Sequence, residues 1–107
     1  MIYHSTRSQS NPVDSAQAVL NGLAFDGGLY VPETVPALDV ENVLKMSTMD
    51  MATTIIGSLL PEIPQMDQLV RAAYTGKFET EDLTPLVKVG DAYVLELFRG
   101  PTSAFKD

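Results

Sequence analysis

Lys106 is the residue of this sequence whose type and surroundings are best suited to chemistry. It follows an apolar run typical of a strand, from Tyr93 to Phe98, and then a Gly-Pro turn, two hydroxyl residues and an aromatic ring. Strand-to-loop junctions of this kind are where α/β enzymes place reactive groups. A primary amine attacks a carbonyl carbon only when it is unprotonated, a state that burial or a nearby positive charge favours. The pattern indicates a lysine nucleophile, and the alternative interpretation is a solvated surface amine.

Other side chains offer hydrogen bonds rather than a nucleophile. Ser5, Thr6 and Arg7 combine hydroxyls with a guanidinium fork, which suits a phosphate group. Thr102 and Ser103 are hydroxyl residues that can donate hydrogen bonds to a carboxylate or a phosphate. Ordinary turn chemistry and a strand-end surface arginine explain the same residues, and we favour that interpretation. Whether any of the five contacts a substrate stays open.

Start and stop signals mark the helices of the chain. Asp14 and Ser47 are each followed three residues later by a residue suited to a capping pair. Gly22 and Gly76 follow apolar stripes of helical spacing, as glycines at helix ends commonly do. The spacing predicts helices over 14–22, 48–60 and 65–75, and a short helix through 42–44.

Alternating or β-branched runs predict the strands. Residues 1–6 alternate weakly and predict an edge strand, and residues 29–31 form a short apolar run that ends at Pro32. Residues 86–89 and 93–98 are separated by Gly-Asp-Ala, which predicts a hairpin. We therefore expect an α/β fold in which amphipathic helices pack on a small sheet.

The order of these elements suggests two parts. Residues 1–85 are predicted to form one amino-terminal domain, and residues 86–107 to form a hairpin that begins a second, truncated domain. Because the sequence ends one residue after Lys106, without the helix that such a loop normally enters, we expect the chain to be the front part of a larger enzyme.

Composition excludes several classes of partner. The chain of 107 residues is 45% hydrophobic and 20% charged, with a net charge of −7, which is globular rather than disordered. The negative charge repels nucleic-acid phosphates and anionic lipid, and no apolar run is long enough to span a bilayer. There is no cysteine, and His4 is the sole histidine, so we expect no disulfide and no metal site. We expect a cytoplasmic protein.

Two stretches together resemble threonine synthase, a pyridoxal-phosphate enzyme family of the tryptophan-synthase-β-like fold. The first is Ser5-Thr6-Arg7 followed by the run AVLNGLAFDGGLYVP over residues 18–32. The second is ELFRGPTSAFKD over residues 96–107, which is similar to the family's GPTxAFKD box. The chain departs from the common pattern at Ser8, Arg99 and Ser103, where the family usually has glycine, histidine and leucine. None of these departures removes the lysine.

The resemblance implies a fold, a cofactor and a reaction. Lys106 corresponds to the lysine that holds pyridoxal 5'-phosphate covalently and then moves protons. The parent enzyme would convert O-phosphohomoserine and water to threonine and phosphate. The cofactor's phosphate cradle would lie beyond Asp107, so we expect Lys106 to be exposed, and the chain alone to be inactive and to hold no cofactor.

Two alternatives remain at this stage. The parent is another lyase of the same fold, similar to a dehydratase, or the chain is a small interaction module without activity. As the front part of a larger enzyme, the chain is expected to expose an apolar surface around Tyr93, Leu95, Leu97 and Phe98, where the rest of the enzyme would pack, and to form a homodimer through it.

Overall fold

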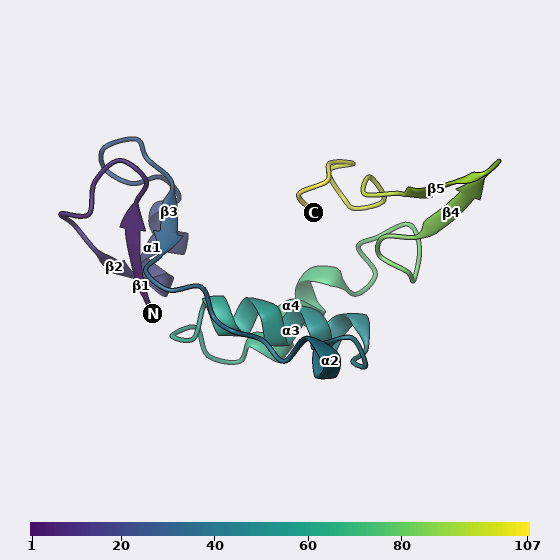
Figure 1. Ribbon diagram of the computed structural model, residues 1–107, viewed down its shortest axis with the longest axis horizontal. Helices are drawn as coiled ribbons and strands as arrows, with labels where there is room; N and C mark the ends of the chain where they lie inside the picture. Colours follow the sequence, from purple (N-terminus) through teal and green to yellow (C-terminus); the bar gives the residue numbers. More distant parts are fainter. The chain divides into compact units, whose positions relative to one another are not determined.

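The computed structural model describes residues 1–107, which form two compact units, Met1–Val70 and Arg71–Asp107. Four helices and two small antiparallel sheets confirm the predicted α/β class (Figure 1). Helix α4 (Met66–Tyr74) runs across the boundary between the units. The predicted domains, 1–85 and 86–107, were defined as parts of a longer enzyme, and this division stays a prediction.

The first unit is built on a three-stranded sheet whose order is β2-β1-β3. Strand β1 (Ile2–Ser5) pairs with β2 (Val13–Asp14) on one side and with β3 (Tyr30–Pro32) on the other, both antiparallel. The prediction of an edge strand at residues 1–6 is therefore wrong. A second partner was not visible in the sequence because β2 is only two residues long, too short for an alternating pattern.

The predicted caps set the bounds of the helices. Helix α1 (Ser15–Asn21) begins after Asp14, whose carboxylate accepts a hydrogen bond of 2.8 Å from the Gln17 amide. It ends at Gly22, which has a positive φ of 71° and whose N–H donates to the Ala18 carbonyl. Both cap predictions are confirmed, and the physical reason is the same at each end: an otherwise unpaired backbone group finds a partner.

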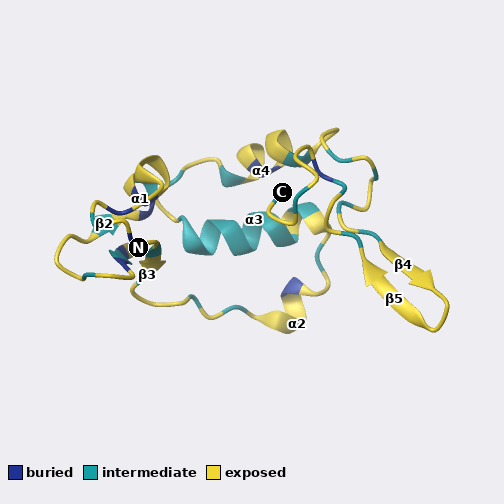
Figure 2. Cartoon of the chain, turned by 90° about the horizontal axis from the view of Figure 1, so that it is seen from above, coloured by how far each residue is buried: buried dark blue, intermediate teal, exposed yellow.

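The three later helices are short and partly exposed. Helix α2 (Val40–Val43) is capped by Asp39, and α3 (Thr48–Leu59) is capped by Ser47, whose hydroxyl accepts from the Asp50 amide at 3.2 Å. These helices confirm the predicted ones near 42–44 and 48–60, and α4 confirms the one near 65–75. Every residue of α3 from Met51 to Leu59 is half-buried (Figure 2).

The apolar core of the chain is small. Its buried apolar residues are Tyr3, Ala18, Ala24, Val43 and Val70. The large apolar side chains of α1 are exposed, with Val19 at 55% and Leu20 at 81%, and Leu23, which follows the C-cap, is 60% exposed. Beside α1 lies an open apolar groove of about 380 Å³, lined by Tyr3, Ala18, Val19, Gly22, Leu29, Tyr30 and Leu60.

Polar contacts join the sheet to the end of α3. The Tyr3 hydroxyl donates a hydrogen bond of 2.7 Å to the Leu59 carbonyl. The Glu62 carboxylate accepts hydrogen bonds from both the Met1 amine and the Ser15 hydroxyl. The Met1 amine and then Ser15 are the main causes that lower the pKa of Glu62 to about 2. The strand that begins the chain is thereby tied to α1 and α3 together.

A tight turn between α1 and β3 is held by the end of β1. Ser5 donates a hydrogen bond of 2.7 Å to Asp26, and the Gly28 amide donates 2.9 Å to the same carboxylate oxygen. A Cβ on Gly28 would collide with Ser5 Oγ and would lie 3.1 Å from Thr6 Oγ1. A side chain at residue 28 would therefore have to displace the Ser5 hydroxyl from its place beside the turn.

The second unit contains the hairpin of β4 (Leu86–Val89) and β5 (Ala92–Leu95), with Gly90 in the turn at a φ of 60°. The predicted hairpin is confirmed, although β5 ends three residues earlier than predicted. Every residue of both strands is exposed (Figure 2). No helix anywhere in the chain has the length and apolar character that a bilayer crossing requires.

We predict that acid weakens the first unit through Glu62. Its folded-state pKa of about 2 lies below its ordinary value of 4.5, so the stabilisation is complete above about pH 4.5 and is lost as the pH falls toward 2. Urea unfolding between these pH values should show a steeper loss of stability for the wild type than for Glu62→Gln. The exposed Glu41→Gln is the control and should follow the wild type; equal pH profiles for all three proteins would contradict the prediction.

Two glycine substitutions should change stability with opposite signs. Gly28→Ala should lower the free energy of unfolding by about 1–3 kcal/mol, because the added methyl group displaces Ser5 from Asp26. Gly57→Ala, inside α3, meets only Met66 Cγ at 3.7 Å and should raise it by about 0.5–1 kcal/mol through helix propensity. Denaturant titration at pH 7 measures both, and a neutral Gly28→Ala would mean that the turn does not need this approach.

Candidate functional site

Lys106 lies in the loop that follows β5 in the second unit. The loop runs from Glu96 to Asp107, and Lys106 and Phe105 are both exposed, Phe105 at 83%. The expected exposure of the lysine is confirmed. An exposed amine is hydrated, so this loop alone does not provide the desolvated surroundings that activate a lysine nucleophile.

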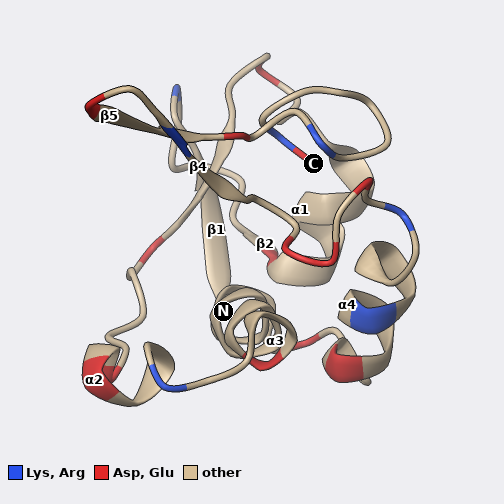
Figure 3. Ribbon diagram, turned by 90° about the vertical axis from the view of Figure 1, so that its right-hand side faces the viewer, with Lys and Arg blue, Asp and Glu red and all other residues tan.

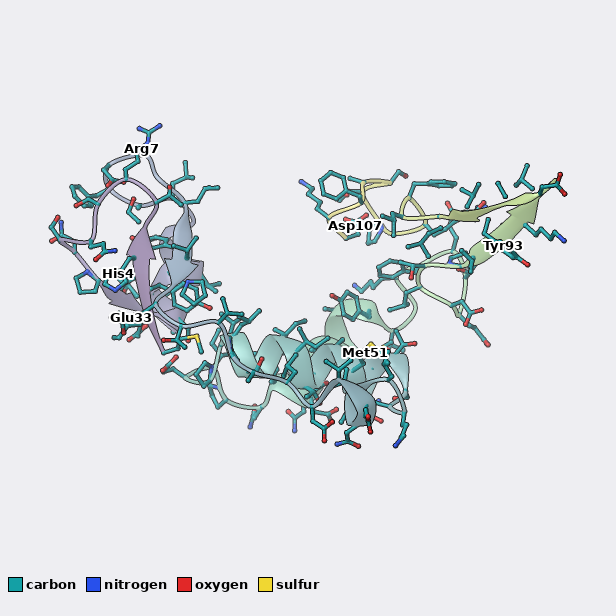
Figure 4. All side chains as sticks on the ribbon, in the orientation of Figure 1. His4, Arg7, Glu33, Met51, Tyr93 and Asp107 are labelled. Atoms are coloured by element: carbon teal, nitrogen blue, oxygen red, sulfur yellow. The ribbon has the colours of Figure 1, made fainter.

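The end of the loop is closed by the carboxylate of Asp107 (labelled in Figure 4). One of its oxygens accepts a hydrogen bond of 2.9 Å from the Thr102 amide, and the other accepts a hydrogen bond of 2.5 Å from the Thr102 hydroxyl. The hydrogen bond from the Thr102 side chain is the main cause that lowers the pKa of Asp107. Residues 102–107 therefore form a compact turn on which Lys106 is carried.

The start of the loop is anchored by Arg99. Its guanidinium bonds Glu79 at 2.7 Å and Glu96 at 2.7–2.8 Å, and these two carboxylates, Glu79 first, raise the pKa of Arg99. The Glu79 amide also donates 3.0 Å to the Arg99 carbonyl. The guanidinium further lies 5.0 Å from the ring centre of Phe98. A planar fork suits this arrangement because it can meet two carboxylates at once.

The hydroxyls of Ser5 and Thr6 are used inside the first unit. The Ser5 hydroxyl donates a hydrogen bond to Asp26 and accepts one of 3.1 Å from the Arg7 amide. The Thr6 hydroxyl accepts a hydrogen bond of 3.0 Å from the Leu29 amide. The Ser5 hydrogen bond is the main cause that lowers the pKa of Asp26. These contacts support the structural interpretation of both hydroxyls.

Arg7 differs from its neighbours because much of its donor capacity faces solvent. Its Nη1 donates a hydrogen bond of 3.0 Å to the Asp26 carbonyl, and the side chain projects from the loop (Figure 4).

His4 lies on β1, and its Nε2 is 3.5 Å from a Glu33 carboxylate oxygen. No group of three or more His, Cys, Asp and Glu side chains is arranged to hold a metal ion.

The structure brings together some of the predicted residues and adds others. Thr102 meets Asp107, and Ser5 meets Arg7, but these two sets lie in different units. Sequence reasoning missed the partners Asp26, Glu79 and Glu96. The spacing of Glu96 three residues before Arg99 was a usable signal, whereas Glu79 is 20 residues away and gave none.

Comparison with protein families and curated proteins gives one consistent result. The family described as "Threonine synthase N terminus" matches residues 2–88. Threonine synthase of Saccharomyces cerevisiae is 39% identical over 99% of this chain, which spans 23% of that protein. Threonine synthase of Methylobacillus glycogenes is 40% identical over 100% of this chain and 26% of its own length.

Solved structures agree with these relatives. The PLP-bound threonine synthase of Brucella melitensis superposes with a TM-score of 0.82 at 35% identity, over 99% of this chain and 24% of that one. The Escherichia coli enzyme gives a TM-score of 0.81 at 31% identity, over 99% of this chain and 25% of that one. The chain thus spans about a quarter of the length of the proteins it matches. It belongs to the threonine synthase N-terminal family.

Proposed function

We propose that this chain is the amino-terminal part of a threonine synthase, whose intact form converts O-phosphohomoserine and water to threonine and phosphate with pyridoxal 5'-phosphate. The observation that carries the proposal is similarity to threonine synthases over 99–100% of the chain, which includes the loop with Lys106. The family match at residues 2–88 supports the same parent independently of that loop.

Lys106 is the residue of this chain that fits the cofactor. Its exposed amine would hold the cofactor covalently, and the cofactor's ring would supply the electron sink of the reaction. Tight binding also needs donors for the phosphate and walls that exclude water. The Thr102 hydroxyl is already bonded to Asp107, and Phe105 is 83% exposed, so the 107 residues fit the covalent attachment and not the rest of the site.

We predict different labelling patterns for the chain and for the full-length protein that carries it. After addition of pyridoxal phosphate and reduction with borohydride, the 107-residue chain should carry label on all four of its lysines, which are exposed: Lys45, Lys77, Lys88 and Lys106. In the full-length protein the label should concentrate on Lys106, because only there is the amine enclosed. Mass spectrometry of peptides measures both patterns.

Activity provides the second arm of this test. The full-length protein should release phosphate from O-phosphohomoserine and should turn over serine and threonine far more slowly, which distinguishes it from a dehydratase-like lyase. Lys106→Ala should abolish turnover, while Lys88→Ala, a substitution on the exposed hairpin, should not. Selective labelling of Lys106 in the 107-residue chain would overturn the claim that its site is incomplete.

Small molecules are the partners we propose for the intact enzyme, rather than nucleic acid or a membrane surface. The net charge is −7, and acidic residues lie on α2, on α4 and at the β4–β5 turn (Figure 3). Such a surface repels phosphate-rich polymers and anionic lipid. We further propose a cytoplasmic location, in line with a chain that has no cysteine.

The exposed hairpin supports a further proposal about partners. Leu86, Tyr93 and Leu95 are 63%, 65% and 53% exposed, and an isolated two-stranded hairpin is only marginally stable in water. In the intact enzyme, the remainder of the polypeptide would cover this surface. In the 107-residue chain, a second copy would cover it by pairing at a free strand edge.

We therefore expect concentration-dependent dimerisation of the 107-residue chain. Sedimentation velocity over a wide concentration range should show a monomer–dimer equilibrium, which Leu95→Arg should weaken by at least tenfold, because the substitution places a charge in the contact. Leu44→Arg is the matched control, since Leu44 is 71% exposed in the first unit and should not affect association. A monomer at every concentration would contradict the proposal.

A further inference from the structure

Three residues of the lysine loop form a closed contact that the sequence did not reveal. Asp107 accepts two hydrogen bonds from Thr102, one on each carboxylate oxygen, at 2.9 Å and 2.5 Å. A bidentate contact of this kind fixes the orientation of the carboxylate as well as its position. We call Gly100, Thr102 and Asp107 the loop clasp.

Gly100 makes this contact sterically possible. It is buried, and a Cβ at this position would lie 2.5 Å from Asp107 Cβ and 2.6 Å from Oδ2. A Cβ atom does not come this close to a non-bonded atom in real proteins, so any side chain at residue 100 would push Asp107 away from Thr102. The Gly-Pro-Thr run thus begins with glycine because Asp107, seven positions further along the chain, packs against its Cα.

Backbone contacts within the loop add to the clasp. The Ser103 amide donates a hydrogen bond of 3.1 Å to the Gly100 carbonyl, and the Asp107 amide donates one of 3.2 Å to the Ala104 carbonyl. Ser103 has a positive φ of 55°, a conformation that a serine adopts only when its surroundings require it. The segment between Thr102 and Asp107 is therefore constrained at both ends and in its middle.

We propose that the loop clasp positions Lys106: Asp107 and Thr102 hold the loop in the one conformation that presents the lysine amine for covalent attachment. Both carboxylate oxygens are bonded within the loop, and the adjacent amine stays exposed to solvent. This inference rests on the proposed function, because it assumes that Lys106 is the attachment site. Asp107 and Thr102 act through Lys106 and are positioning residues, not catalytic ones.

The test compares trapping rates at Lys106 in the full-length protein. With pyridoxal phosphate and borohydride, Asp107→Ala and Thr102→Val should each slow labelling of Lys106 by about 10- to 100-fold, the effect expected when a reacting group loses its alignment. The double variant should be no slower than either single variant, since both break one contact. Thr102→Ser keeps both donors and should retain the wild-type rate, and the exposed Asp91→Ala is the matched control.

Each outcome bears on a different claim. Hydrogen exchange of the peptide covering residues 100–107 should rise in Asp107→Ala and Thr102→Val while exchange elsewhere is unchanged, which separates loss of the clasp from loss of the fold. Wild-type trapping rates in both variants, or additive losses in the double variant, would overturn the positioning role alone. Absence of label at Lys106 in the unsubstituted protein would instead overturn the proposed function together with this inference.

Discussion

The central position of β1 is the constraint on which the first unit depends. Successive residues of a strand point to opposite faces, so Tyr3 and Ser5 share one face, and both are buried. Tyr3 reaches the end of α3 through the Leu59 carbonyl, and Ser5 holds the turn at Asp26. A shift of β1 by one residue would turn both side chains to the other face and break these contacts together.

Polar contacts supplement a small apolar core in this unit. Ser15 is fully buried and bonds Glu62, while large apolar side chains such as Leu20 stay exposed. A chain that leaves so much apolar surface open commonly uses it as a contact surface. The match to about a quarter of each threonine synthase is consistent with such a surface, because the remainder of those enzymes has no counterpart among these 107 residues.

The proposed attachment of the cofactor at Lys106 has two requirements, an ordered loop and an activated amine. Order is local: Arg99 anchors the start of the loop through Glu79 and Glu96, and Asp107 closes its end on Thr102. Activation needs a desolvated amine, and that depends on surfaces the loop does not provide. A loop of this kind can be ordered by its own contacts, whereas activation of its amine requires an enclosing pocket.

The sequence by itself determined the features that depend on neighbours a few residues away. The caps at Asp14 and Ser47, the helices they begin, the hairpin and the family motifs were all predictable, because each reflects a local hydrogen bond or a short pattern. Only the tertiary structure decided that β1 is central, that Ser5 serves Asp26, and that Glu79 meets Arg99. The Ser5–Asp26 and Glu79–Arg99 contacts join residues 21 and 20 positions apart, and a side chain's type does not reveal which distant partner the folded backbone will bring within hydrogen-bonding distance. The pairing of β1 with β2 was hidden because a strand of two residues has no pattern of its own.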